Sequence, residues 1–313
     1  MTETRENAAQ TGKGTILFGG SGFLGPYILE NYPDVISVGR TAPSTANRHI
    51  QVDNLANLDA LRDVAFDKVI FIIGNTDHYN LEKEHVPAGE PTAFDYHVTP
   101  LIQTLEQLKS RPIKKFINFS TILVYDDKKI TLPISEHSPI TPYRNRYVLS
   151  KYLGEEACKF YAKWMPIITV RLSNIYGPTP LKRFDLIHLL VHQLLDQGKG
   201  QVWSTKPERD FIYVNDAAHA IVKLLDTDYT GLLNLGTGTM TSVRQIVDLL
   251  QELSGCPITD LNKPTEGPMK FRCDMTTLEK LIDWKPRYST EEGVGRTYEL
   301  MKSWREKSYE AGN

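Results

Sequence analysis

The sequence predicts an α/β fold in which a doubly wound parallel sheet is followed by a smaller C-terminal α+β lobe. Short apolar runs rich in β-branched residues recur through the first half of the chain, and helical stretches separate them. Strands that alternate with helices in this way are typical of a parallel sheet with helices on both faces. After about residue 176 the alternation gives way to helices mixed with short strands and proline-bearing loops, which indicates the second lobe.

The individual elements follow from the apolar pattern. Five runs are expected to be parallel strands, at residues 14–18, 34–38, 68–73, 115–119 and 167–171. A helix is expected over 99–109, because Leu101, Leu105 and Leu108 fall on one side of it. In the second lobe, helices are expected over 184–197 and 242–253. The predicted organisation is a flexible polar tail over 1–13, a first domain over 14–175 joined by 210–236, and an interleaved lobe over 176–313.

The composition excludes several classes of partner. The 313 residues carry 36 Lys and Arg against 38 Asp and Glu, a net charge of -2, so no nucleic acid or membrane surface is expected as a partner. The three cysteines, Cys158, Cys256 and Cys273, are far apart, and we expect neither a metal site nor disulfides. No apolar run approaches the roughly 18 residues of a membrane span. We therefore expect a cytoplasmic protein.

A glycine motif follows the first expected strand directly. Gly19, Gly22 and Gly25 stand in the segment GGSGFLG, and a helix is expected over 23–31 with Pro26 in its first turn. Glycine is needed where the chain turns tightly and where backbone N–H groups approach a pyrophosphate. A bare strand-to-helix turn would use the same residues. The position between strand and helix favours a Rossmann domain that binds a dinucleotide, with Phe23 and Leu24 also at the cofactor.

The choice between NAD and NADP depends on the end of the second strand, where an acidic residue would bind the ribose 2′-hydroxyl. Here the sequence reads Gly39-Arg40-Thr41. Arg40 can bind a 2′-phosphate through two N–H groups, which favours NADP, or it stacks on adenine or faces solvent. Asp53, after a strand-like run over 49–52, is either an adenine contact or a turn carboxylate. Residues 79–94 are expected to form a surface loop near the cofactor.

A tyrosine and a lysine stand four residues apart, at Tyr147 and Lys151, so a helix would place both on one face. A phenol has a pKa of about 10 and is a poor base at neutral pH. A nearby ammonium favours the phenolate, which can then remove a hydroxyl proton as hydride leaves the same carbon. Thr121, placed after the fourth strand, can donate to the substrate oxygen. The alternative for Tyr147 and Lys151 is an exposed helix face, and the alternative for Thr121 is a loop-capping hydroxyl.

An ordered set of motifs resembles the extended short-chain dehydrogenases/reductases of the NAD-dependent epimerase/dehydratase family that act on nucleotide sugars. The resemblance runs from Thr15 to about Gly293. Its motifs are GGSGFLG, then Phe119-Ser-Thr-Ile-Leu-Val-Tyr125, Tyr147 with Lys151, Arg171-Leu-Ser-Asn-Ile-Tyr-Gly-Pro178, Arg209-Asp-Phe-Ile-Tyr-Val-Asn-Asp216, Asn234-Leu-Gly-Thr-Gly238 and Leu281-Ile-Asp-Trp-Lys-Pro286.

The resemblance implies a role for each matching residue. Thr121, Tyr147 and Lys151 match the family's catalytic residues, and Tyr147 and Lys151 would also bind the cofactor. Asn174 and Arg209 match residues that bind the substrate diphosphate, which suits the fork of a guanidinium. A local ion pair of Arg209 with Asp210 is the alternative. Helices over 99–109 and 147–163 resemble the family's dimer interface, so a homodimer is expected.

Departures from the family pattern narrow the reaction. Ile122 and Leu123 stand where the 4,6-dehydratases carry Asp-Glu, and Leu123 also replaces the cysteine of GDP-fucose synthases. Neither side chain can move a proton, so neither reaction is expected. His97 stands where the family often has asparagine, and a buried helix histidine is the simpler interpretation. The usual late arginine of the substrate lobe has the candidates Lys263, Lys270 and Arg272.

We therefore expect an NAD(P)-dependent nucleotide-sugar oxidoreductase or 4-epimerase, with Tyr147 as acid/base and no metal. Arg40 favours a reductase or dehydrogenase. One alternative is an NADPH-dependent reductase of a non-nucleotide carbonyl, which would have no use for Asn174 and Arg209. Another is a non-catalytic dinucleotide-binding protein, which would have no use for the three catalytic residues. The sequence does not specify the sugar, the base or the stereochemistry.

Overall fold

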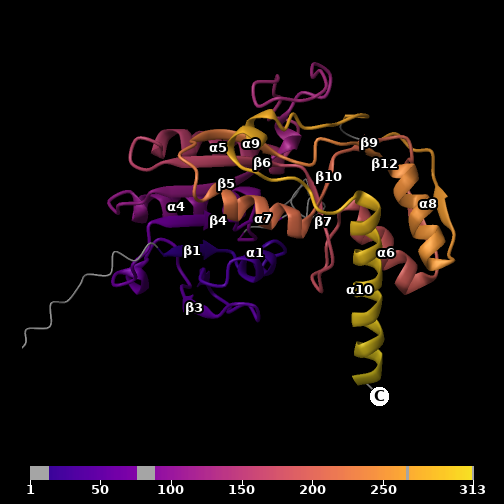
Figure 1. Ribbon diagram of the computed structural model, residues 1–313, viewed down its shortest axis with the longest axis horizontal. Coiled ribbons are helices and arrows are strands. Elements are labelled where there is room, and N and C mark those ends of the chain that lie inside the picture. Colours follow the sequence, from indigo (N-terminus) through magenta and orange to yellow (C-terminus); the bar gives the residue numbers. More distant parts are fainter. Residues whose placement is uncertain (1–13, 76–88, 266–267, 312–313) are drawn as a thin grey trace, which may run out of the picture.

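A computed structural model describes residues 14–75, 89–265 and 268–311 of the chain. Seven parallel strands form one sheet in the order β11-β6-β5-β4-β1-β2-β3 (Figure 1). Their bounds are Thr15–Phe18 for β1, Ile36–Gly39 for β2, Arg48–Gln51 for β3, Lys68–Phe71 for β4, Lys115–Thr121 for β5, Ile167–Leu172 for β6 and Gly231–Leu235 for β11. The predicted Rossmann-like parallel sheet is confirmed. The strand order reverses between β1 and β4, and such a switch point leaves a crevice at the carboxyl edge of the sheet.

Helices cover both faces of this sheet because successive strand residues point to opposite sides. Ile16 and Phe18 of β1 pack in one core with helix α4 (Thr99–Leu108) and helix α5 (Arg146–Tyr161). The short helix α3 (Ala93–His97) lies against both of these helices. Leu17 points the other way, into a core with helix α1 (Gly25–Asn31) and helix α7 (Val214–Leu224). The buried strands therefore read as continuous apolar runs.

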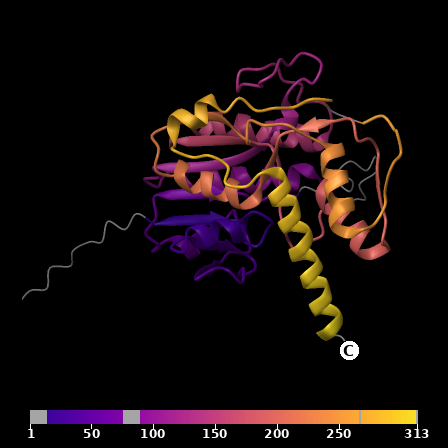
Figure 2. The same ribbon diagram turned by 45° about the vertical axis from the view of Figure 1, so that its right-hand side comes forward.

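The second lobe has its own core, built from three helices. They are α6 (Leu186–Gln197), α8 (Val243–Ser254) and α10 (Thr290–Ala311), and both views place them together beside the sheet (Figures 1 and 2). Three small sheets complete the lobe, formed by β7 (Asn174–Tyr176) with β10 (Phe211–Tyr213), β9 (Glu208–Arg209) with β12 (Thr241–Ser242), and β8 (Gly200–Val202) with β13 (Ile258–Asp260). Helix α9 spans Thr276–Leu281.

Several predicted boundaries are corrected by the residues that cap the helices. The helix expected from 184 begins at Leu186, because the Asp185 carboxylate accepts from the backbone N–H of His188. The helix expected from 242 begins at Val243, because Ser242 and Gln245 form a capping box. The helix expected from 23 begins at Gly25. Strand β5 continues two residues further than expected, so Thr121 is its last residue rather than part of the following loop.

Two predicted segments lie wholly or mostly outside the residues that the structure describes. The tail over 1–13 lies outside the described residues, as does most of the predicted loop over 79–94. The end of that loop is helical, because α3 begins at Ala93 behind a capping box made by Thr92 and Asp95. Across the described residues, no helix combines the length and apolar composition needed to cross a bilayer.

One buried ion pair joins helix α5 to the middle of the sheet. Arg171 of β6 donates from Nε and Nη2 to the two carboxylate oxygens of Glu155, at 2.9 and 2.6 Å, and both side chains are buried. Ser120 of β5 donates to the same carboxylate at 2.5 Å. Burial alone would lower the pKa of Arg171, but the hydrogen bonds and charge of Glu155 raise this pKa above its ordinary range.

We predict that Glu155→Gln lowers the free energy of unfolding by about 3–5 kcal/mol, because Arg171 is left buried without its counter-charge. Urea unfolding followed by circular dichroism measures the effect. The control is Glu156→Gln, which removes the neighbouring surface carboxylate paired with Lys159 at 2.6 Å. Exposed pairs of that kind contribute about 0–1 kcal/mol. Equal losses in the two variants would contradict the assignment.

Candidate active site

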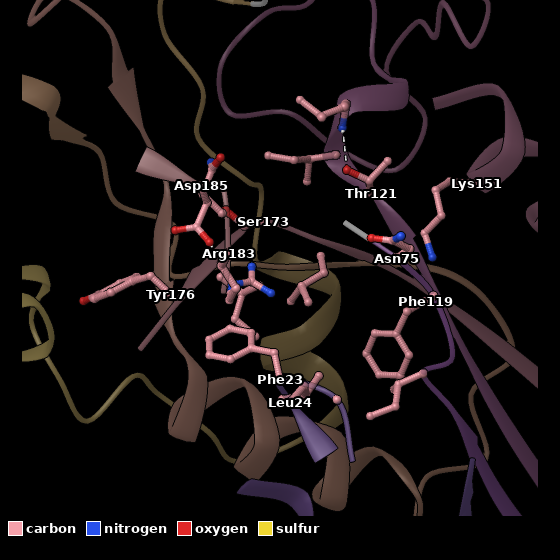
Figure 3. Close-up of a pocket in the computed structure, with 18 of the residues that line it drawn as sticks. Phe23, Leu24, Asn75, Phe119, Thr121, Lys151, Ser173, Tyr176, Arg183 and Asp185 are labelled. Carbon is pink, nitrogen blue, oxygen red and sulfur yellow. Dashed lines mark hydrogen bonds and ion pairs between the residues drawn. The ribbon is translucent and has the colours of Figure 1, made fainter. Parts of the chain in front are cut away.

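A cavity of about 380 Å³ opens at the carboxyl edge of the parallel sheet, where the strand order reverses (Figure 3). Four chain segments that follow β1, β4, β5 and β6 form its floor, and residues 181–187 from the start of the second lobe form the opposite wall. Ligands of open α/β sheets bind in this position. The candidate site residues that line the cavity are Gly22, Phe23, Leu24, Thr121, Tyr147, Lys151 and Asn174.

The glycine motif forms a tight turn at the edge of this cavity. Gly19 has a left-handed φ of +93°, and the Gly22 N–H donates to its carbonyl at 3.0 Å. A Cβ at Gly25 would lie 2.2 Å from the Gly20 oxygen, so only glycine lets α1 approach the turn this closely. A Cβ at Gly22 would meet only the Gly19 oxygen, at 3.3 Å. The cavity side of the turn is therefore open, as binding of a pyrophosphate requires.

The two residues proposed to read the adenosine end of the cofactor lie elsewhere. Arg40 follows β2 and is exposed, and it is not among the residues that line the cavity. Asp53 follows β3 and is exposed as well, and its carboxylate accepts from Gln51 Nε2 at 3.2 Å. Their assignment to the cofactor remains a prediction.

The three candidate catalytic residues converge from two elements. Tyr147 and Lys151 stand one turn apart on α5, which begins at an Asn145 cap, and Thr121 ends β5. The Thr121 hydroxyl accepts from the Leu123 N–H at 3.2 Å (Figure 3) and makes a hydrogen bond with the Tyr147 side chain. The structure therefore places a hydroxyl, a phenol and an ammonium on the wall of one cavity.

Burial and nearby charge set the ionisation of this group. Burial raises the pKa of Tyr147 to about 12, and the hydrogen bond with Thr121 and the positive charge of Arg183 lower it from a still higher value. The sequence predicts a positive charge from Lys151 here, and Arg183 is a further positive charge that lowers this pKa. Burial lowers the pKa of Lys151 to about 8, and the negative charge of Glu155 opposes this shift.

His97 is buried in α3 beside the catalytic helix. Its ring meets the Tyr147 ring edge-on, with 5.4 Å between the centroids. Nδ1 lies 2.8 Å from the Ser150 hydroxyl, and Nε2 lies 3.0 Å from the Asn75 N–H. Because His97 also lines the cavity, it lies at the site and contacts more than one partner, beyond the single bond of a simple buried helix histidine.

The two candidate diphosphate ligands differ in position. Asn174 lines the cavity and donates from Nδ2 to the Asp210 carbonyl at 3.0 Å. Arg209 is partly buried on β9 and does not line the cavity. Burial lowers its pKa to about 10, and no carboxylate of the described residues forms an ion pair with it. The predicted alternative of an ion pair with Asp210 is wrong, because that carboxylate accepts from the N–H groups of Thr237, Gly238 and Cys273.

The remaining cations proposed for the substrate lobe lie outside the cavity lining. Lys270 pairs with Glu208 at 2.8 Å. Lys263 donates its backbone N–H to the Trp203 carbonyl at 2.7 Å. The buried Nε of Arg272 has no hydrogen-bond partner among the described residues. Within the same residues, no group of His, Cys, Asp or Glu side chains could hold a metal ion.

Arg183 and Asp185 form a charged cluster on the cavity wall that the sequence motifs did not indicate. Arg183 reaches into the cavity above Phe23, opposite Lys151 and Asn75, and Asp185 lies behind it (Figure 3). The Arg183 guanidinium lies 4.0 Å from the centre of the Phe23 ring and donates from Nε to Asp185 at 2.8 Å. The only sequence signal was an aspartate before an apolar helix, which predicts a cap and not a site.

The parallel sheet, the glycine turn and the cavity at the switch point place the chain in the Rossmann-like class of α/β proteins. Within that class, the chain belongs to the NAD dependent epimerase/dehydratase family, whose model matches residues 15–236. The family indicated by the sequence motifs is therefore confirmed.

Known proteins resemble the chain along most of its length. A protein of Methanocaldococcus jannaschii, provisionally named a UDP-glucose 4-epimerase, is 29% identical over 309 residues, which cover 92% of this chain and 98% of that protein. The structure of the Thermotoga maritima UDP-glucose 4-epimerase with UDP-glucose has a TM-score of 0.81 at 21% identity, over 93% of this chain and 99% of that one. The Bacillus cereus UDP-glucuronic acid 4-epimerase, in complex with UDP-glucuronic acid and NAD, has a TM-score of 0.79 at 23% identity, over 93% and 99%.

We predict that Arg209→Met leaves the free energy of unfolding unchanged or raises it, because a buried guanidinium without a carboxylate opposes folding. The same change should weaken binding of the preferred nucleoside diphosphate about 10- to 100-fold, as expected for lost charge-assisted hydrogen bonds. Calorimetry with UDP, dTDP and GDP selects that ligand and measures its affinity.

The matched control is Arg111→Met. Arg111 is also a partly buried arginine, but it donates to two carbonyls distant in sequence, those of Leu61 and Val64, at 2.8 Å. Arg209 donates only to the carbonyl of the adjacent Glu208, at 3.2 Å, among the described residues. This variant should lose stability and keep its affinity for the nucleotide. If Arg209→Met behaved in the same way, Arg209 would be a structural residue.

Proposed function

We propose that this protein is an NAD-dependent enzyme that oxidises or epimerises a hydroxyl-bearing carbon of a nucleotide sugar, with Tyr147 as the acid/base. The observation that carries the proposal is the convergence of Thr121, Tyr147 and Lys151 on one cavity that Gly22 of the glycine turn also lines. A non-catalytic dinucleotide-binding protein would need the turn and not the three side chains.

The residues divide the chemistry between them. The Thr121 hydroxyl holds the substrate oxygen and the Tyr147 phenol in one hydrogen-bonded group. Tyr147, as phenolate, removes the proton of the hydroxyl group on the carbon that loses hydride. The Lys151 ammonium would bind the ribose hydroxyls of the cofactor and would keep a positive charge beside the phenolate. A nicotinamide held here would supply the hydride acceptor.

The substrate class rests on the anion-binding groups. Arg209 is a partly buried guanidinium with no carboxylate partner in the described chain, and Asn174 lies on the cavity wall. An uncharged carbonyl substrate would offer these residues no anionic acceptor, whereas a diphosphate supplies several acceptor oxygens. The M. jannaschii and T. maritima relatives, both named for UDP-glucose, support a nucleotide sugar.

The reaction type follows from what stands beside Thr121. Ile122 and Leu123 line the cavity where proton-transferring groups would be needed for dehydration or for epimerisation at C3 and C5. Tyr147 is therefore the acid/base of the site, and a single acid/base is sufficient for oxidation and reduction at one carbon. We favour 4-epimerisation over net oxidation or reduction, because three of the similar proteins that span the chain are named 4-epimerases.

The proposed organisation keeps the cofactor on residues 14–175 and 210–236 and the substrate on the remaining lobe over 176–313. Two elements from the second half of the chain return to the sheet. Helix α7 packs on α1, and strand β11 pairs with β6. This return of the chain to the sheet supports an interleaved arrangement.

We predict that Tyr147→Phe reduces turnover about 10²–10⁴-fold, the usual contribution of a general acid/base group. Binding of cofactor and nucleotide sugar should remain nearly unchanged, because the ring is kept. Lys151→Met should lose the same chemistry and also bind the cofactor more weakly. Steady-state kinetics and calorimetry measure both effects. A Tyr147→Phe enzyme with near-normal turnover would exclude Tyr147 as the acid/base.

We propose NAD as the cofactor, in place of the NADP that Arg40 favours in the sequence. The B. cereus structure contains NAD, and Arg40 is an exposed side chain outside the cavity. Calorimetry should therefore show NAD binding at least as tightly as NADP, and Arg40→Ala should change the ratio little. A clear preference for NADP that is lost in Arg40→Ala would restore the original assignment.

We propose a homodimer formed by α4 and α5. These helices and the turn after α5 expose large apolar side chains at Ile102, Leu153, Phe160 and Trp164. Light scattering should give twice the mass of the chain, and Phe160→Glu should shift the protein toward the monomer. Leu300→Glu, at an exposed leucine of α10, is the control and should leave the mass unchanged. A monomeric parent at micromolar concentration would contradict the proposal.

A further inference from the structure

The segment before α6 contributes a largely buried arginine, Arg183, to the cavity wall. The Arg183 side chain is 11% exposed although it belongs to a loop and not to the core. Its guanidinium stacks on the Phe23 ring at 4.0 Å, and Phe23 is part of the glycine turn. An arginine of the substrate lobe is thereby fixed against the loop that is proposed to bind the cofactor.

A chain of contacts behind Arg183 fixes its position. Arg183 Nε donates to Asp185 at 2.8 Å, and the second oxygen of Asp185 lies 2.6 Å from His188 Nδ1. His188 Nε2 in turn donates to the Gly177 carbonyl at 2.6 Å. Burial opposes the charge of Asp185, but His188 and Arg183 hold its pKa at about 2. The carboxylate is therefore ionised, and it fixes one edge of the guanidinium.

The other edge of the guanidinium faces the cavity. Among the described residues, Arg183 donates a hydrogen bond only from Nε, so its two terminal nitrogens are available on the cavity side. Figure 3 shows them opposite Lys151 and Asn75. The charged and titratable groups that line the cavity together with Tyr147 are His97 from α3, Lys151 from α5, Tyr176 from β7, and Lys182, Arg183 and Asp185 from the segment before α6.

We propose that Arg183 is a positioning residue that, held by Phe23 and Asp185, supplies the substrate lobe's positive charge to the acid/base Tyr147. The inference rests on the proposed function, because it requires Tyr147 to act as the acid/base. It assigns to the second lobe a part of the catalytic electrostatics that the sequence motifs place only on α5.

The electrostatics of the site agree with this geometry. The charge of Arg183 lowers the pKa of Tyr147, against the effect of burial. Removing that charge must therefore raise the pKa of Tyr147. Because oxidation needs the phenolate, the ascending limb of the pH profile must then move to higher pH. Lys182 lines the same cavity but is not among the groups that shift this pKa.

The contact between Arg183 and Phe23 adds a structural consequence. The charge reaches Tyr147 only while the segment before α6 is packed on the glycine turn. The acid/base is therefore tuned by the contact between the two lobes as well as by its own helix, and a change that loosens this contact acts on proton transfer before it acts on binding.

The test is the pH profile of kcat/KM for the nucleotide sugar, measured with the NAD-loaded protein and its Arg183→Gln, Arg183→Lys and Lys182→Gln variants. Arg183→Gln should move the ascending limb to higher pH by about 0.5–1 unit. This is less than the one to three units of a direct ion pair, since Asp185 shares the charge. Arg183→Lys keeps a charge without the planar stack and should give a smaller shift. Lys182→Gln should leave the limb in place.

Two outcomes overturn the inference. One is a limb that stays in place in both Arg183 variants while KM rises, since Arg183 would then bind substrate without acting on Tyr147. The other is an equal shift in Lys182→Gln, which would reflect the general charge of the cavity. Should Arg183→Gln fail to fold, Arg183→Lys against the parent decides the question. Tyr147→Phe separates this inference from the proposed function, because its loss of turnover is expected whatever Arg183 does.

Discussion

The buried pair of Glu155 and Arg171 is the interaction on which the geometry of this site depends. Glu155 stands one helical turn after Lys151 and two turns after Tyr147 on α5, so its two hydrogen bonds to Arg171 fix the catalytic face of the helix against β6. Its third contact is Ser120, the residue before Thr121. One carboxylate thus sets the distance between the strand end that carries the hydroxyl and the helix that carries the phenol.

The two lobes meet at this same edge of the sheet. After β6 the chain continues into β7, which begins at Asn174. The segment that carries Arg183 follows and lines the cavity. Helix α5 and the end of β5 thereby supply the acid/base and its partners, while a loop held by Asp185 supplies a further charge. This division fits an enzyme whose chemistry stays fixed while the groups around the substrate vary.

Periodicity and short motifs were sufficient to predict the sheet, the glycine turn and the meeting of Thr121 with Tyr147, because each depends on local spacing or on strands ending at one edge. Helix ends were less predictable, since the caps at Asp185 and Ser242 decide them. Arg183 could not be predicted, because its role arises from a stack on Phe23, 160 residues away in the sequence. The ion pair of Arg209 with Asp210 was also wrongly anticipated, since the Asp210 carboxylate accepts from the distant backbone N–H groups of Thr237 and Cys273.

The proposed function requires that this cavity transfers hydride from a nucleotide sugar to a bound nicotinamide. The most direct measurement is the near-ultraviolet absorbance of the NAD-loaded protein after rapid mixing with a panel of UDP-, dTDP- and GDP-sugars. At least one sugar should produce the absorbance of reduced nicotinamide, lasting for a net oxidation and transient for an epimerisation. A protein that binds NAD and these sugars, yet shows no reduced nicotinamide with any of them, would contradict it.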